Sequence, residues 1–201
     1  VVAVTAYGMS TFEGPMLSPK SVNAIMHYTD WIISHVHVGA LGWNGFLTFG
    51  ILYWLVPRLW NTTLYSRKLA NVHFWIATLG IVFYAVSMYT AGLTQSLLWK
   101  QFTAMGTLQY PNFLETVLRI YPLYIVRAVG GTLYLTGVCL MIYNLMKTAR
   151  QGTFVAEEQH QAPPLLPEGP HHRGTRHRGL ERKPDQCGGG GLGVILIGGG
   201  G

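Results

Sequence analysis

The chain has 201 residues, of which 49% are hydrophobic and only 11% are charged. Charged residues make up about 25% of an ordinary soluble domain, so this composition indicates an integral membrane protein. The formal net charge of +6 does not indicate a nucleic-acid partner, because much of it lies in a C-terminal tail and not on an amphipathic face.

The apolar segments predict helices in chain order. Residues 1–12 have the character of the end of a membrane helix, which Glu13, Gly14 and Pro15 should terminate. A short segment at residues 21–28, with Ser21 or Asn23 as its N-cap, leads toward the first complete span. Complete spans, each long enough to cross a bilayer, are predicted at about residues 29–56, 72–99 and 121–146.

These segments predict an all-α transmembrane fold with three complete membrane helices and the end of a fourth. The abrupt apolar start indicates a fragment of a longer protein. We expect residues 1–150 to be membrane-embedded and residues 151–201, rich in Pro, Gly, His and Arg, to form a low-complexity or disordered tail. Its histidines are interpreted as part of a solvated basic segment. Cys139, in an apolar stretch, is interpreted as a packing residue.

The positions of basic residues predict the orientation in the membrane. Basic residues follow the first span and also end the third span, and both groups lie on one side because successive spans alternate in direction. These residues are Arg58, Arg67, Lys68, Lys147 and Arg150. We assign this side to the cytoplasm. The start of the first span, with His35 and His37, then lies toward the outer face, as does Arg127 in the third span.

Two histidines, His35 and His37, lie near the start of an apolar stretch without Lys, Arg, Asp or Glu at residues 31–57. Successive positions on an α-helix differ by about 100°, so these side chains should project about 200° apart. They therefore cannot bind one metal ion together, and the spacing suits two separate partners. The alternative is a pair of hydrogen-bonded packing residues. Because polar groups inside a membrane are costly and mark function, a cofactor or transport role is favoured.

Arg127 is the ionised residue of the third span. An arginine inside a membrane needs an anionic partner, and none of the predicted spans offers a carboxylate at a matching depth. The partner is therefore expected outside this chain or in a ligand, and a haem propionate would suit it.

The motifs resemble one known family. YGMSTFEGPM (residues 7–16), HYTDW (27–31) and HVHVGALGW (35–43) closely resemble the catalytic subunit I of cbb3-type cytochrome c oxidases, the C family of the haem-copper oxidases. LANVHFW (69–75), AGLTQ (91–95) and VRAVGG (126–131) agree with it. Ser96 and Lys100 stand where Gly and Arg are expected. The resemblance covers residues 1–150 and implies the end of helix nine and helices ten to twelve of a twelve-helix subunit.

The resemblance also implies roles for individual residues. His35 would be the proximal ligand of the high-spin haem b iron, and His37 an axial ligand of the low-spin haem b iron. His27 and Arg127 would lie near haem propionates. Glu13 would lie near the proximal side of the high-spin haem, where a carboxylate lowers the reduction potential of the iron; without the resemblance it is an ordinary charge at a helix end. For His73 a packing role is favoured over ligation.

The implied parent protein reduces O2 to water with electrons from cytochrome c and couples this reaction to proton pumping. It would be a multi-pass protein of the bacterial inner membrane, in contact with lipid, with the remaining helices of subunit I and with c-type cytochrome subunits. The copper of the parent enzyme has no ligands in this stretch, which should be inactive alone. The alternatives are a nitric oxide reductase of the same superfamily and a haem-free transport or structural bundle.

Overall fold

The computed structural model describes residues 1–155, which form helices and contain no strand. The helices are α1 (Val2–Leu17), α2 (Lys20–Met26), α3 (Asp30–His37), the π-helix η1 (Val38–Gly45), α4 (Phe46–Leu59), α5 (Arg67–Trp99) and α6 (Phe113–Gln151). Three continuous stretches are long and apolar enough to cross a membrane: Asp30–Leu59, Arg67–Trp99 and Phe113–Gln151. The predicted all-α fold with three membrane helices is thus confirmed. The predicted tail lies almost wholly outside the described residues.

Helix α1 continues past the residues that should have ended it. The backbone N–H and the hydroxyl of Ser18 both donate to the Pro15 carbonyl, at 3.2 and 2.8 Å, and close a last turn after the proline. The helix therefore ends at Leu17. The N-cap of α2 is Pro19, and the predicted caps Ser21 and Asn23 lie inside the helix; the Asn23 side-chain amide donates to the Leu17 carbonyl.

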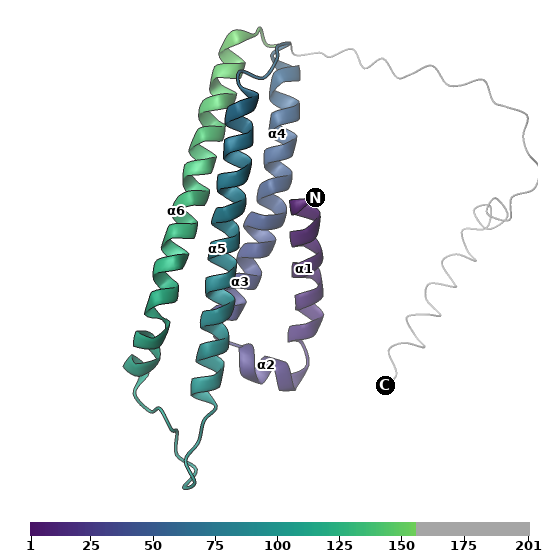
Figure 1. Ribbon diagram of the computed structural model, residues 1–201. Coiled ribbons are helices and arrows are strands. Elements are labelled where there is room, and N and C mark those ends of the chain that lie inside the picture. Colours follow the sequence, from purple (N-terminus) through teal and green to yellow (C-terminus); the bar gives the residue numbers. More distant parts are fainter. Residues whose placement is uncertain (156–201) are drawn as a thin grey trace, which may run out of the picture. The chain divides into compact units, whose positions relative to one another are not determined.

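The first complete span consists of three consecutive segments, α3, η1 and α4 (Figure 1). The Thr29 hydroxyl accepts a hydrogen bond from the Trp31 backbone N–H and starts α3. After His37 the backbone widens into eight residues of π-helix, a conformation that is rare and concentrates at functional sites. Its glycines allow α1 to approach closely, since a β-carbon on Gly42 would lie 3.0 Å from the β-carbon of Ala6.

The two longest helices, α5 and α6, pack side by side along most of their length (Figure 1). Both begin earlier than predicted, because polar side chains outside the apolar stretches cap them. The Ser66 hydroxyl accepts from the Leu69 N–H, and the Asn112 side chain accepts from the Leu114 N–H. A close contact between Gly80 and Gly130 brings the two backbones together, as is common between membrane helices.

The α4–α5 connection and the C-terminal end of α6 lie at the same end of this bundle, opposite the connection between α5 and α6 (Figure 1). The Val155 N–H donates to the Leu59 carbonyl at 2.8 Å, and the Tyr65 N–H donates to the Thr148 hydroxyl at 3.0 Å. The alternation of the spans is therefore as predicted.

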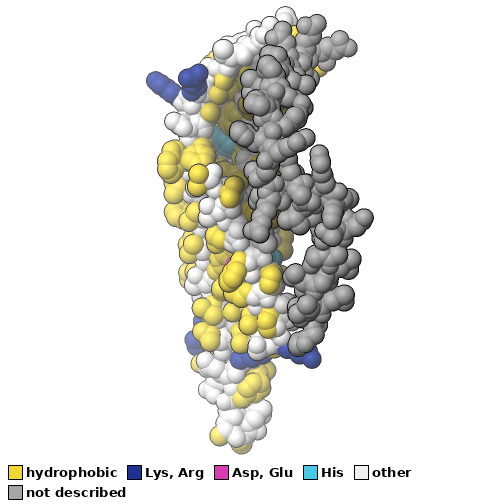
Figure 2. All heavy atoms as spheres, turned by 90° about the vertical axis from the view of Figure 1, so that its right-hand side faces the viewer, with side chains coloured by type: hydrophobic (Ala, Val, Ile, Leu, Met, Phe, Trp, Pro, Cys, Tyr) yellow, Lys and Arg dark blue, Asp and Glu magenta, His cyan; other side chains and the backbone are white. Residues whose placement is uncertain are grey.

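Figure 2 shows basic side chains at two levels of one face, with apolar side chains between them. Cys139 is exposed among the described residues, so the packing partner expected for it is not found in this part of the chain.

Candidate functional site

His35 and His37 leave the last turn of α3 in different directions, as their spacing predicts. His35 contacts Glu13 of α1, whereas His37 contacts Tyr84 of α5. Each imidazole is half-buried. The two rings therefore face separate environments, and what each nitrogen contacts determines what each ring can bind.

The Nδ1 atom of His35 lies 2.9 Å from Oε2 of Glu13, which forms the one ion-pair contact among residues 1–155. Glu13 is buried, with only 8% of its surface exposed. The same carboxylate oxygen accepts a hydrogen bond of 2.7 Å from the Tyr89 hydroxyl. An ionised carboxylate can only accept hydrogen bonds, so Nδ1 of His35 carries the proton and Nε2 keeps its lone pair.

The Nδ1 atom of His37 lies 2.7 Å from the backbone carbonyl of Ile33, one helical turn earlier. A carbonyl oxygen can only accept, so here too Nδ1 carries the proton and Nε2 holds the lone pair. Nε2 lies 3.2 Å from the Tyr84 hydroxyl, and the two rings stack with centroids 4.6 Å apart. His35 thus faces a carboxylate and His37 a neutral carbonyl.

An apolar cavity of about 350 Å³ opens beside His37. Its walls come from η1, α5 and α6 and include Leu41, Tyr84, Gly131 and Leu135. A β-carbon added at Gly131 would meet no atom within 4 Å, so this glycine leaves space on the cavity wall. The combination of an imidazole lone pair with an apolar cavity suits a largely apolar, metal-containing ligand.

Arg127 is half-buried within α6, and no carboxylate oxygen of the described residues lies within 4 Å of it. Its guanidinium lies over the Tyr124 ring, 4.8 Å from the centroid, and its Nη1 atom lies 3.6 Å from the Met88 sulfur. The same tyrosine connects Arg127 to a carboxylate, although not at ion-pair distance. Tyr124 donates a hydrogen bond of 2.8 Å to Asp30, which is only 5% exposed.

His27 lies at the C-cap of α2, away from the hydrogen bonds around His35 and His37. Its exposed ring stacks on Tyr28 with centroids 4.0 Å apart and planes 3° apart. Tyr28 has a φ of +63° and so turns the chain sharply between α2 and α3. Within residues 1–155 the His27 ring has no hydrogen-bond partner.

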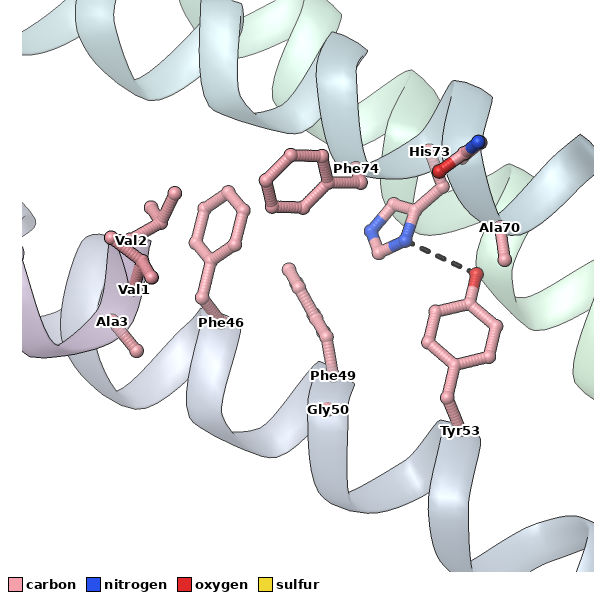
Figure 3. A pocket seen from close by; sticks show the side chains of 11 residues that line it. Val1, Val2, Ala3, Phe46, Phe49, Gly50, Tyr53, Ala70, His73 and Phe74 are labelled. Carbon is pink, nitrogen blue, oxygen red and sulfur yellow. Dashed lines mark hydrogen bonds between the residues drawn. The ribbon is translucent and has the colours of Figure 1, made fainter. Parts of the chain in front are cut away.

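His73 lies in a different place, on α5 beside α4. It is buried, and its Nδ1 atom lies 3.1 Å from the Tyr53 hydroxyl. The ring also packs edge-on against Phe49, and both residues line a second cavity of about 300 Å³ (Figure 3). The contacts of the His73 ring with Phe49 and Tyr53 agree with the packing role that the sequence favours. Residues 1–155 contain no group of three His, Cys, Asp or Glu side chains placed to hold a metal ion.

Three contacts of the candidate site were not foreseen: Tyr89 on Glu13, Tyr84 on His37 and Tyr124 on Asp30. A tyrosine in an apolar helix resembles any other aromatic packing residue. Only its distance from a titratable group, which depends on the fold, separates the two roles.

Comparison with known proteins finds relatives of one family. Residues 1–133 match the family described as "Cytochrome C and Quinol oxidase polypeptide I". The chain is 58% identical over 153 residues to "Cytochrome c oxidase subunit 1 homolog, bacteroid" of Bradyrhizobium diazoefficiens, covering 76% of this chain and 28% of that protein. It is 46% identical over 151 residues to "Cbb3-type cytochrome c oxidase subunit CcoN1" of Stutzerimonas stutzeri, covering 75% and 32%.

A solved structure shares the fold. It is a cryo-EM structure of a heme-copper terminal oxidase dimer, with a TM-score of 0.60 and 20% identity, covering 82% of this chain and 30% of that chain. The chain thus spans about three tenths of the length of each of these three proteins.

Proposed function

Because the chain belongs to the cytochrome c and quinol oxidase polypeptide I family, we propose that it is part of a cbb3-type terminal oxidase. The whole enzyme would reduce O2 to water with electrons from cytochrome c and couple this reaction to proton pumping. It would lie in the bacterial inner membrane with the remaining helices of subunit I and c-type cytochrome subunits. The single observation that carries the proposal is the divergent pair His35 and His37. In each ring Nδ1 lies at hydrogen-bond distance from an acceptor, which leaves the lone pair of Nε2 available to bind a metal.

We assign the high-spin haem b to His35 and the low-spin haem b to His37. When bound, haem iron supplies one-electron transfer and the binding of O2. The protein supplies the ligand tautomer and the ring orientation, because Glu13 and Ile33 each hold an Nδ1–H. Both ligands come from one helix, so that helix would fix the two haems relative to each other.

The cavity beside His37 supports a haem there. Its apolar walls and the free space at Gly131 suit the face of a flat macrocycle. The Tyr84 hydroxyl must turn away when a metal binds, since it donates to the same Nε2 lone pair. Tyr84 then remains as a wall of the cavity.

We assign Arg127 and His27 to the haem propionates. Arg127 supports this role because it has a half-buried positive charge and no carboxylate at ion-pair distance within the described residues. His27 rests on the family motif alone. The copper ligands of the oxygen-reducing site would come from the remaining part of the subunit, and residues 1–150 alone should have no oxidase activity.

The test replaces His35 or His37 by Ala in the full-length subunit and records haem content and reduced-minus-oxidised spectra. We expect His35→Ala to remove the high-spin signal and His37→Ala the low-spin signal. His73→Ala is the matched control, because it also removes a membrane histidine but should leave both signals in place. A high-spin signal that survives His35→Ala, or a low-spin signal that survives His37→Ala, would overturn the proposed function.

A further inference from the structure

Three helices meet at one oxygen atom of the candidate site. Oε2 of Glu13, on α1, lies 2.9 Å from Nδ1 of His35, on α3, and 2.7 Å from the hydroxyl of Tyr89, on α5. Tyr89 is 54 residues from His35 in sequence and makes no direct hydrogen bond to it. Any effect of Tyr89 on His35 must therefore pass through the carboxylate.

The packing around Tyr89 holds its hydroxyl in place. Its ring lies against Trp31, with centroids 4.7 Å apart and planes 59° apart. Tyr89 is half-buried and Glu13 is buried, so little water competes for the carboxylate oxygen. A hydrogen bond to a charged acceptor in such a site is short and strong.

We propose that Tyr89 is a positioning residue that sets how strongly Glu13 accepts the proton of His35, and thereby tunes the metal that His35 holds. The inference rests on the proposed function, because it takes His35 to be the proximal haem ligand. A hydroxyl that donates to Oε2 draws negative charge away from the His35 N–H. His35 is then a weaker electron donor than it would be beside Glu13 alone.

Two substitutions should consequently act in opposite directions on the haem at His35. Tyr89→Phe removes the competing donor, strengthens the Glu13–His35 hydrogen bond and makes the imidazole more basic. This stabilises the oxidised iron and lowers its reduction potential. Glu13→Gln removes the negative charge and raises the potential. The haem at His37 should not respond, because the Nδ1 atom of His37 faces a backbone carbonyl.

The experiment uses the full-length subunit in its complex. The midpoint potentials of the two haems are measured by spectroelectrochemistry, and the iron–histidine stretch of the reduced high-spin haem by resonance Raman spectroscopy. We expect Tyr89→Phe to lower the high-spin potential and raise the stretching frequency, and Glu13→Gln to do the reverse. Tyr7→Phe is the matched control, since Tyr7 is exposed and only its ring packs, against Trp43.

An unchanged or raised high-spin potential in Tyr89→Phe, with normal haem content, overturns the inference. If the Phe variant fails to assemble, 3-fluorotyrosine at position 89 gives the opposite test: the more acidic phenol donates more strongly and should raise the potential. A high-spin haem that survives His35→Ala would instead overturn the proposed function. Loss of that haem in His35→Ala together with an unresponsive Tyr89 variant would overturn the inference alone.

Discussion

The hydroxyl of Tyr124 donates a hydrogen bond of 2.8 Å to the carboxylate of Asp30 across 94 residues of sequence. The Gln95 side-chain amide donates to the same carboxylate oxygen at 3.0 Å, and its carbonyl oxygen accepts from the Asp30 backbone N–H at 2.7 Å. The start of α3 is thereby fastened to α5 and α6. Because His35 lies in the next turns of α3, this network holds the helix that carries the candidate ligands.

Replacing Tyr124 by Phe should weaken this attachment. The variant loses one hydrogen bond between membrane helices, which costs about 0.6–1.7 kcal/mol, and leaves Asp30 with one donor fewer. Tyr121→Phe is the control, because Tyr121 lies on the same helix and is 60% exposed. Thermal unfolding of the full-length subunit in detergent measures both variants. Equal unfolding temperatures for the two variants would contradict the prediction.

Neighbouring glycines on α6 should differ sharply in their tolerance of alanine. A β-carbon on Gly130 would lie 2.7 Å from the Gly80 carbonyl oxygen and 2.7 Å from the Tyr84 backbone nitrogen, whereas one on Gly131 would meet nothing within 4 Å. Gly130→Ala should therefore destabilise the subunit by about 1–3 kcal/mol through overpacking. In the haem-free subunit, where no macrocycle competes for the cavity beside Gly131, Gly131→Ala should gain up to about 1 kcal/mol from helix propensity.

Denaturant unfolding followed by circular dichroism compares these two variants directly. The substituted side chain is the same methyl group at adjacent positions, so general effects of alanine cancel. A Gly130→Ala variant as stable as Gly131→Ala would contradict a close backbone contact between α5 and α6 at Gly130.

The spans were predictable from sequence, but their ends were not. Long apolar stretches determine where a helix can cross a membrane. The ends depend on single capping groups, such as Ser66 and Asn112, that lie in polar sequence several residues outside the apolar stretch. The π-helix Val38–Gly45 has no signal in hydrophobic periodicity. Its glycines lie in close contact with Ser10 and Ala6 of α1, which the local sequence does not reveal.

The candidate site was predictable to the extent that it is local. The divergence of His35 and His37 follows from helical geometry alone, and the structure agrees with it. The contact between Glu13 and His35 spans 22 residues and was expected only because the motif resembles a family. Asp30 starts a span, and its position in the sequence gives no sign that it is buried. Its burial depends on Gln95 and Tyr124, which lie on other helices.

Arg127 provides a test of the propionate assignment through charge. Replacing it by Gln removes a positive charge that favours the reduced, more negative haem, so the midpoint potential of the neighbouring haem should fall. A charge about 10 Å away at an effective dielectric constant of about 20 contributes on the order of 1–2 kcal/mol. Arg119→Gln is the control, because Arg119 is an exposed cation two turns earlier on α6. Spectroelectrochemical titration of the full-length complex measures both haems. Unchanged midpoint potentials in Arg127→Gln would contradict a specific role for Arg127 beside the propionates. An equal fall of the potentials in Arg119→Gln would contradict it as well.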